Sequence, residues 1–144
     1  MGYTHYWSKA GPFSNAQWAA LTEAAEAIVK QAKSDGLLLC WEYDEPAKDP
    51  EISAAAIRFN GVHSEGHETF LLSPQAEEFE FCKTAAKPYD AAVVAMLVFA
   101  KQLAPELFNW RSDGLPEDHA DGLALLTRAN GLSVESNASS NEED

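Results

Sequence analysis

The chain has 144 residues and a formal net charge of −13, and these two values limit its architecture and its partners. This length suits one hydrophobic core, so we expect a single domain. A nucleic-acid duplex is not expected as a partner because its phosphates require clustered Lys and Arg. A membrane is not expected either, because no run of about eighteen apolar residues occurs.

The first half of the chain predicts one long helix among several strands. Residues 2–8 alternate with period two and predict the first strand. Residues 15–34 follow a capping box of Ser14 and Gln17 and carry an apolar stripe, which predicts a helix. Four further strands are predicted, at 37–43, 54–61, 67–72 and 77–84.

The second half predicts another long helix and a polar tail. Pro88 suits the first position of a helix over 88–104, because its missing N–H has no partner there in any case. A short strand at 108–114 and a third, shorter helix within 116–131 follow. The last residues are acidic and polar and are expected to be disordered. We therefore expect two parts, a domain over 1–132 and a tail over 133–144.

This order of elements predicts the fold class. Strands at hairpin-like spacing lie between the two long helices, which favours an α+β two-layer sandwich with a mainly antiparallel sheet. Both long helices should then cover one face of the sheet. The opposite face should be solvated, used for binding, or paired in a homodimer.

The stretch FCKTAAKPYD joins a predicted strand to a predicted helix and suggests an anion site. Lys83, Thr84 and Lys87 would surround the amide groups of a helix N-terminus, where a phosphate or carboxylate binds well. The alternative is an ordinary helix start with exposed lysines, in which Asp90 occupies the positive end of the helix.

Two other groups of residues have catalytic or metal-ligand types. Cys82 beside Lys83 has the setting of an activated nucleophile, but free cysteines are more often buried packing residues. The stretch HSEGHETF has metal-ligand types, yet its glycines favour a hairpin rather than the helix that a zinc motif needs. We therefore assign no catalytic residue, no metal and no cofactor. Cys40 and Cys82 lie in predicted strands, which favours reduced thiols in a cytoplasm.

The N-terminal stretch GYTHYW offers rings that can hold a planar ligand. His5, Tyr6 and Trp7 together can stack on a ring and donate a hydrogen bond to its edge. The alternative is that the aromatic side chains belong to the core and that His5 is a satisfied buried histidine.

Five motifs resemble a group of small proteins encoded by phages and prophages, namely GYTHYW, RFNG, HETF, FCKTAAKPYD and WRSDG. The resemblance covers about residues 2–114 and is strongest in the first and fourth motifs. It implies a viral accessory protein that acts in the host bacterial cytoplasm. It also directs attention to the polar members of the motifs, which are His5, Asn60, Glu68, Lys83, Thr84, Lys87 and Asp113.

These observations predict a non-enzymatic protein that binds a small anionic, nucleotide-like ligand. By analogy, a phage accessory protein of this kind would sequester a host defence signal. The expected ligand-binding residues are His5, Tyr6, Trp7, Asn60, Glu68, Lys83, Thr84, Lys87 and Asp113. Two alternatives stay open, an acidic protein that inhibits a host enzyme by binding it and a small hydrolase that depends on Cys82 or on a His/Glu cluster.

Overall fold

The computed structural model describes residues 3–131 and 136–139, and every strand pairing among them is antiparallel. One sheet has three strands, with β1 at its centre and β6 and β7 on either side. Its strands are β1 (Thr4–Lys9), β6 (Glu77–Lys83) and β7 (Phe108–Ser112).

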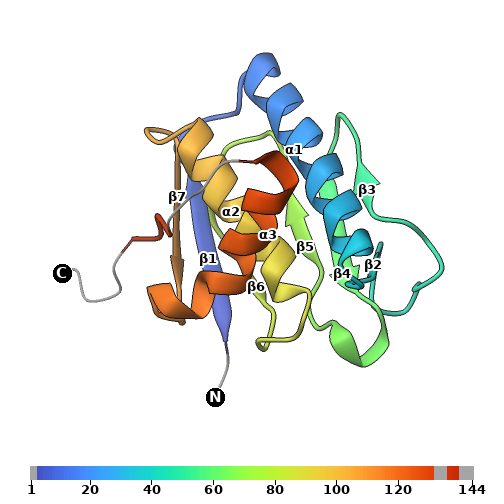
Figure 1. Ribbon diagram of the computed structural model, residues 1–144. Helices are drawn as coiled ribbons and strands as arrows, with labels where there is room; N and C mark the ends of the chain where they lie inside the picture. Colours follow the sequence, from blue (N-terminus) through green and yellow to red (C-terminus); the bar gives the residue numbers. More distant parts are fainter. Residues whose placement is uncertain (1–2, 132–135, 140–144) are drawn as a thin grey trace.

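The second sheet is built around β4 (Ile57–Gly61). Its other strands are β2 (Leu39–Cys40), β3 (Glu51–Ile52) and β5 (Phe70–Leu72). Strands β3 and β5 both pair with Ile57, so they lie on opposite sides of β4. The two sheets lie side by side, with β5 next to β6 (Figure 1). The amide of Glu68 donates to the carbonyl of Lys83 at 3.2 Å and connects them.

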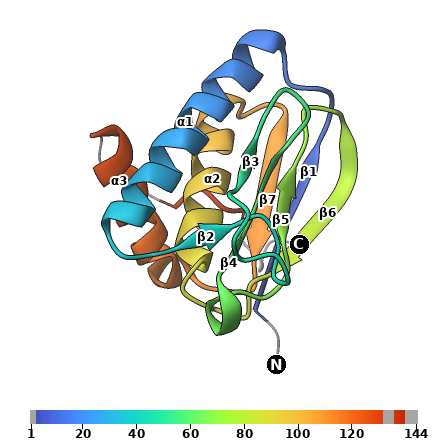
Figure 2. The ribbon, with the colours of Figure 1, turned by 90° about the vertical axis from the view of Figure 1, so that its right-hand side faces the viewer.

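All three α-helices lie on the same side of these strands (Figure 2). They are α1 (Asn15–Ser34), α2 (Asp90–Leu103) and α3 (Ala120–Asn130), and two 3-10 turns span His63–Glu65 and Pro116–His119. Helix α3 packs against α1 and α2 on the side away from the sheet. The predicted α+β sandwich, with an antiparallel sheet and two long helices on one face, is confirmed.

A local sequence signal explains where α1 begins, but not where α2 begins. Ser14 and Gln17 form the predicted capping box, and α1 has the predicted bounds. The prediction that Pro88 is the first residue of the second long helix is wrong, because α2 begins at Asp90 and residues 87–90 form a turn closed by the amide of Asp90 and the carbonyl of Lys87. Most of α2 is buried since the sheet covers one side and α3 covers another. Gly122 permits this close packing, because a Cβ there would lie 2.6 Å from Cβ of Val94.

The segment after Cys40 differs from the prediction. The expected strand over 37–43 is reduced to Leu39–Cys40, and β3 (Glu51–Ile52) forms where no strand was predicted. The chain turns at Trp41, whose amide donates to the carbonyl of Lys48. Two cations contact the Trp41 ring, with Lys48 Nζ at 3.7 Å and the Arg58 guanidinium carbon at 4.1 Å from its centroid. This cation–π packing favours a compact turn over a longer strand.

The expected tail is described only in part. Residues 133–135 and 140–144 lie outside the described residues. Residues 136–139 contact the body of the domain, which differs from the expectation of a disordered segment; their bonds are given below. None of the helices in the described part of the chain has the length and apolar character needed to cross a membrane.

Candidate functional site

Alternation along β1 divides the predicted site residues between the two faces of the sheet. His5 and Trp7 are buried on the face that the helices cover, whereas Tyr6 lies on the opposite, outer face. Tyr6 pairs with Phe81 of β6 and with Arg111 of β7. The outer face of this sheet therefore brings together side chains from three distant parts of the sequence.

Aromatic rings form the centre of this outer face. Phe79 and Phe81 are 56% and 54% exposed, which is unusual for such large apolar side chains. The rings of Tyr6 and Phe79 are stacked with centroids 6.0 Å apart and an interplanar angle of 26°. Phe81 continues the row, with its centroid 5.8 Å from that of Phe79. The result is a nearly continuous aromatic platform in contact with solvent.

Polar groups hold the Tyr6 ring in place. Its hydroxyl donates to Oδ1 of Asp113 at 3.1 Å, and Oδ2 of Asp113 accepts the amide of Thr4 at 3.0 Å. The Arg111 guanidinium lies 5.6 Å from the Tyr6 ring centroid. Partial burial and the neighbouring Asp113 raise the pKa of Tyr6, so its hydroxyl stays neutral and remains a donor.

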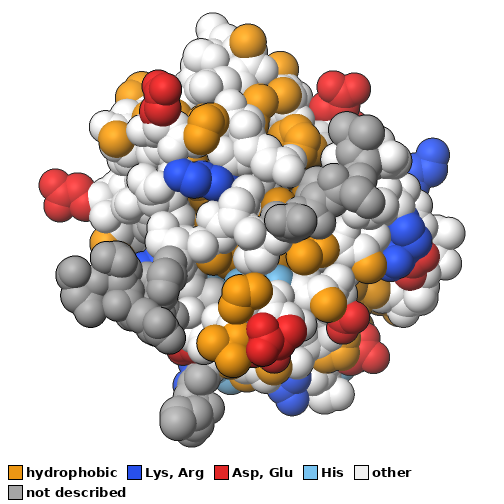
Figure 3. Space-filling model, turned by 60° about the vertical axis from the view of Figure 1, so that its left-hand side comes forward, with side chains coloured by type: hydrophobic (Ala, Val, Ile, Leu, Met, Phe, Trp, Pro, Cys, Tyr) orange, Lys and Arg blue, Asp and Glu red, His pale blue; other side chains and the backbone are white. Residues whose placement is uncertain are grey.

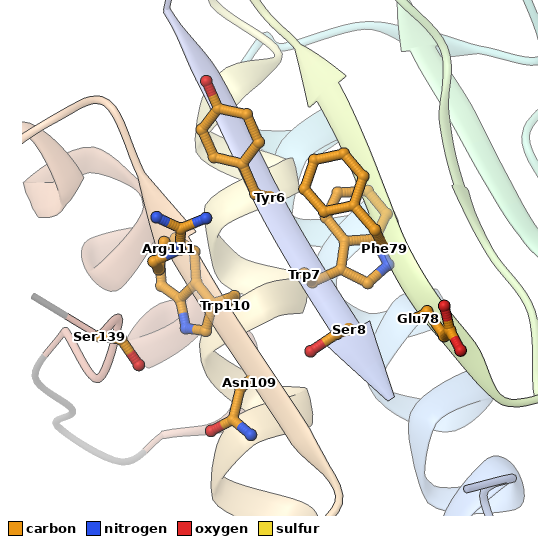
Figure 4. Close-up of a pocket in the computed structure, with 9 residues that line it drawn as sticks. All are labelled: Tyr6, Trp7, Ser8, Glu78, Phe79, Asn109, Trp110, Arg111 and Ser139. Atoms are coloured by element: carbon orange, nitrogen blue, oxygen red, sulfur yellow. The ribbon is translucent and has the colours of Figure 1, made fainter. Parts of the chain in front are cut away.

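A groove of about 330 Å³ opens on this face (Figure 4). Its residues come from β1, β6, β7 and the C-terminal segment, and they are Tyr6, Trp7, Ser8, Glu78, Phe79, Asn109, Trp110, Arg111 and Ser139. The volume lies at the small end of the range for ligand sites. Arg111 supplies a cation, and Asn109, Ser8 and Ser139 supply hydrogen-bonding groups. No histidine or cysteine lines the described groove.

The surface in Figure 3 shows how charges are distributed on one side of the molecule. Acidic and basic side chains are scattered there, with hydrophobic side chains between them. This pattern suits a small ligand that uses one or two cations, rather than a polyanion that needs a continuous basic stripe.

The inner face of the sheet holds a buried polar cluster. His5 Nε2 donates to Oδ1 of Asp90 at 2.6 Å, and the Thr84 hydroxyl donates to the same oxygen at 2.5 Å. His5 and Thr84 are fully buried, and Asp90 is nearly so. Ala85 and Ala86 have φ of 55° and 57°, and this left-handed turn brings Thr84 to Asp90. The cluster fastens β1 to the start of α2.

His119 lies next to this cluster and is also buried. Its ring centroid is 6.0 Å from that of His5 and 5.1 Å from the Trp110 ring. Its Nδ1 is 2.8 Å from the Ser136 hydroxyl oxygen. Burial is the main cause that lowers the pKa of His119, and His5 lowers it further. His119 is therefore favoured in its neutral form.

The geometry at the start of α2 does not support the expected anion site. The amides of Asp90, Ala91 and Ala92 donate to protein carbonyls within the turn, so they are already paired. Lys83 alternates with Phe79 and Phe81 and thus belongs to the outer face. Lys87 lies elsewhere, beside a hollow of about 400 Å³ that also has three carboxylates, from Asp90, Asp118 and Asp121.

The remaining predicted residues mainly stabilise the fold. The Trp7 indole donates to Glu80 at 3.0 Å. Asn60 is buried, and its amide oxygen accepts from the amides of Gly61 and His67 while its nitrogen donates to the His67 carbonyl, which closes the loop after β4. Glu68 accepts the amide of Lys83 at 2.7 Å.

The two cysteines are packing residues in the structure. Cys82 is fully buried and contacts the Glu68 carbonyl and the Tyr89 hydroxyl. Burial raises the pKa of Cys82 to about 12, so the thiolate needed for a nucleophile is disfavoured. Burial also raises the pKa of Cys40. Among the described residues, no group of three or more His, Cys, Asp or Glu side chains is arranged to hold a metal.

Sequence reasoning missed residues on both faces. Phe79 and Phe81 are not among the predicted ligand-binding residues, although two aromatic residues at alternate positions of a predicted strand share one face of it and are a usable signal. Arg111 is not among them either. His119 had no sequence signal, because Ser136 and His5, which it contacts, are 17 and 114 residues away.

Comparison with known proteins found no matching family model, no matching curated protein and no matching solved structure.

Proposed function

We propose that this protein binds a small ligand that combines a planar ring with an anionic group, such as a mononucleotide, on the outer face of the three-stranded sheet. The observation that carries this proposal is the exposed row of Tyr6, Phe79 and Phe81 with Arg111 beside it. A planar ring would stack on the aromatic row, and its anionic group would pair with Arg111. Asn109, whose side-chain oxygen accepts from Lys101 Nζ at 2.7 Å, also lines the groove.

Binding without conversion is the mode that these residues favour. The groove has no histidine or cysteine among its described lining residues, and His5 and His119 are buried on the other face. By analogy, a phage accessory protein of this kind would capture a nucleotide-like host signal. Tyr6, Lys83 and Asp113 are the predicted ligand residues that this site retains.

The test measures the binding of a panel of nucleoside 5′-monophosphates by thermal shift and calorimetry. A bound nucleotide at about a hundredfold over its Kd adds about 2.7 kcal/mol to the free energy of unfolding. For a chain of this size the melting temperature should rise by about 5–10 °C. Adenosine, which lacks the phosphate, and ribose 5-phosphate, which lacks the planar base, should each bind more weakly.

Two substitutions locate the site. Tyr6→Leu removes one stacking ring, which is worth about 1–3 kcal/mol, so affinity should fall about tenfold or more. Arg111→Gln should weaken the nucleotide but leave adenosine nearly unaffected. The matched controls are Tyr43→Leu and Arg128→Gln, which change an exposed tyrosine and an exposed arginine outside the groove. Binding by no member of the panel, or equal losses in the controls, would overturn the proposal.

A second copy of the chain is the competing occupant of this face. The exposed Phe79 and Phe81 also suit a homodimer, because large apolar patches on a sheet usually mark contacts. Light scattering at micromolar concentration distinguishes a ligand site from a homodimer interface. A monomer agrees with ligand binding. A dimer that dissociates when Phe81 is replaced (Phe81→Asp) would assign the face to self-association and contradict the ligand site.

A further inference from the structure

The C-terminal segment 136–139, called the strap below, lies beside β7 (Figure 1). Four hydrogen bonds to other described residues attach it to the domain, and Ala138 packs against the core. Ser136 contacts His119. The side chain of Asn137 accepts from the Trp110 indole at 2.9 Å and donates to the Val98 carbonyl at 3.0 Å. The amide of Ser139 donates to the Trp110 carbonyl at 2.8 Å.

The strap touches both functional regions described above. Ser139 lines the groove on the outer face, whereas Ser136 contacts the buried His119. We propose that the strap is a pH-sensitive wall of the groove, held in place by neutral His119 and released when His119 is protonated. Only its effect on the ligand rests on the proposed function. Docking of the strap is a property of the chain alone.

The surroundings of His119 explain why protonation would release the strap. The side chain is 1% exposed, and its Nε2 has no hydrogen-bond partner among the described residues. The ring faces the rings of Trp110 and His5. A second proton would place a charge and an unpaired N–H in this enclosed site, which costs free energy unless water enters. Departure of the strap removes the Ser136 side of the enclosure and admits water.

Charged groups from three elements face His119. Asp90 on α2 and Asp118 in the same 3-10 turn as His119 favour its protonated form, whereas burial and His5 on β1 oppose it. Burial and His5 outweigh the two carboxylates, so the pKa of His119 is below the ordinary value of 6.5. The strapped state therefore binds fewer protons than the open state. Its stability is complete above about pH 6.5 and is lost as the pH falls through the lowered pKa.

The test follows the strap by NMR on the full chain, without ligand, between about pH 7.5 and pH 5. The Ser139 amide should be protected from exchange at the higher pH, once intrinsic rates are corrected, and should lose protection in step with the titration of the His119 ring. His119→Gln keeps a hydrogen-bonding side chain that does not titrate, so the strap should stay docked at low pH. Ser136→Ala should loosen the strap at every pH.

Two results would overturn the inference. One is a strap that stays protected while His119 is protonated. The other is release in His119→Gln at the wild-type pH. If the strap is undocked in His119→Gln even at pH 7.5, the test uses the wild-type protein alone. It then asks whether the Ser139 amide loses protection at the pH at which the His119 ring titrates. Nucleotide affinity is then measured at pH 7.5 and at pH 5. If the strap is released as expected but the protein binds no nucleotide at either pH, the proposed function is refuted and this inference stands.

Discussion

Removal of the Asp90 carboxylate should destabilise the protein strongly. One oxygen of Asp90 accepts both the His5 N–H at 2.6 Å and the Thr84 hydroxyl at 2.5 Å. Hydrogen bonds to a charged acceptor contribute about 1.5–3 kcal/mol each. Removing one partner of a buried pair costs about 3–5 kcal/mol, because the other polar groups are left unpaired. Asp90→Ala should therefore lower the free energy of unfolding by about 3–5 kcal/mol.

Chemical denaturation measures this loss as a lower midpoint at an unchanged m-value. Asp90→Asn keeps an acceptor oxygen without the charge and should lose about half as much, since neutral hydrogen bonds are about half as strong. Asp113→Ala is the matched control, because Asp113 also accepts two hydrogen bonds but is exposed to solvent. A loss in free energy of unfolding below about 1 kcal/mol for Asp90→Ala, or one no larger than for Asp113→Ala, would refute this role of Asp90.

Three further changes test other parts of the structure. A chain ending at Gly131 should melt several degrees lower than one ending at Ser139, because loss of the strap leaves the Trp110 indole unpaired; equal melting temperatures would contradict the docked strap. Neither cysteine should react with a thiol reagent in the native protein, since burial raises the pKa of both, and rapid labelling of Cys82 would restore the nucleophile hypothesis. Gly122→Ala should cost about 1–3 kcal/mol by overpacking, whereas Gly11→Ala, whose Cβ would have ordinary contacts, should cost little.

Local signals predicted the helices and most strands, but not how far each strand extends. The capping box at Ser14 is a short-range pattern, so the start of α1 could be read from sequence. Trp41 is different, because its cation–π contacts with Arg58 depend on the fold and override the strand propensity around it.

The site could be predicted only in its components. Alternation placed Tyr6 on one face and His5 on the other, but no sequence pattern indicates which face the helices cover. The pairing of Tyr6 with Arg111 and the contact of His5 with Asp90 span 105 and 85 residues. Such contacts follow from sheet register and helix packing, so the expected single cluster separates into an outer platform and a buried network.

The bond from Ser139 to the Trp110 carbonyl also concerns the solubility of the protein. Trp110 lies on β7, the outermost strand of its sheet, and its carbonyl faces away from β1. Unpaired carbonyls and amides along such a strand are a template on which another chain can add a strand, the first step of aggregation. Because Ser139 occupies this carbonyl, a strand from a second copy could not pair with β7 at Trp110 while the strap is docked.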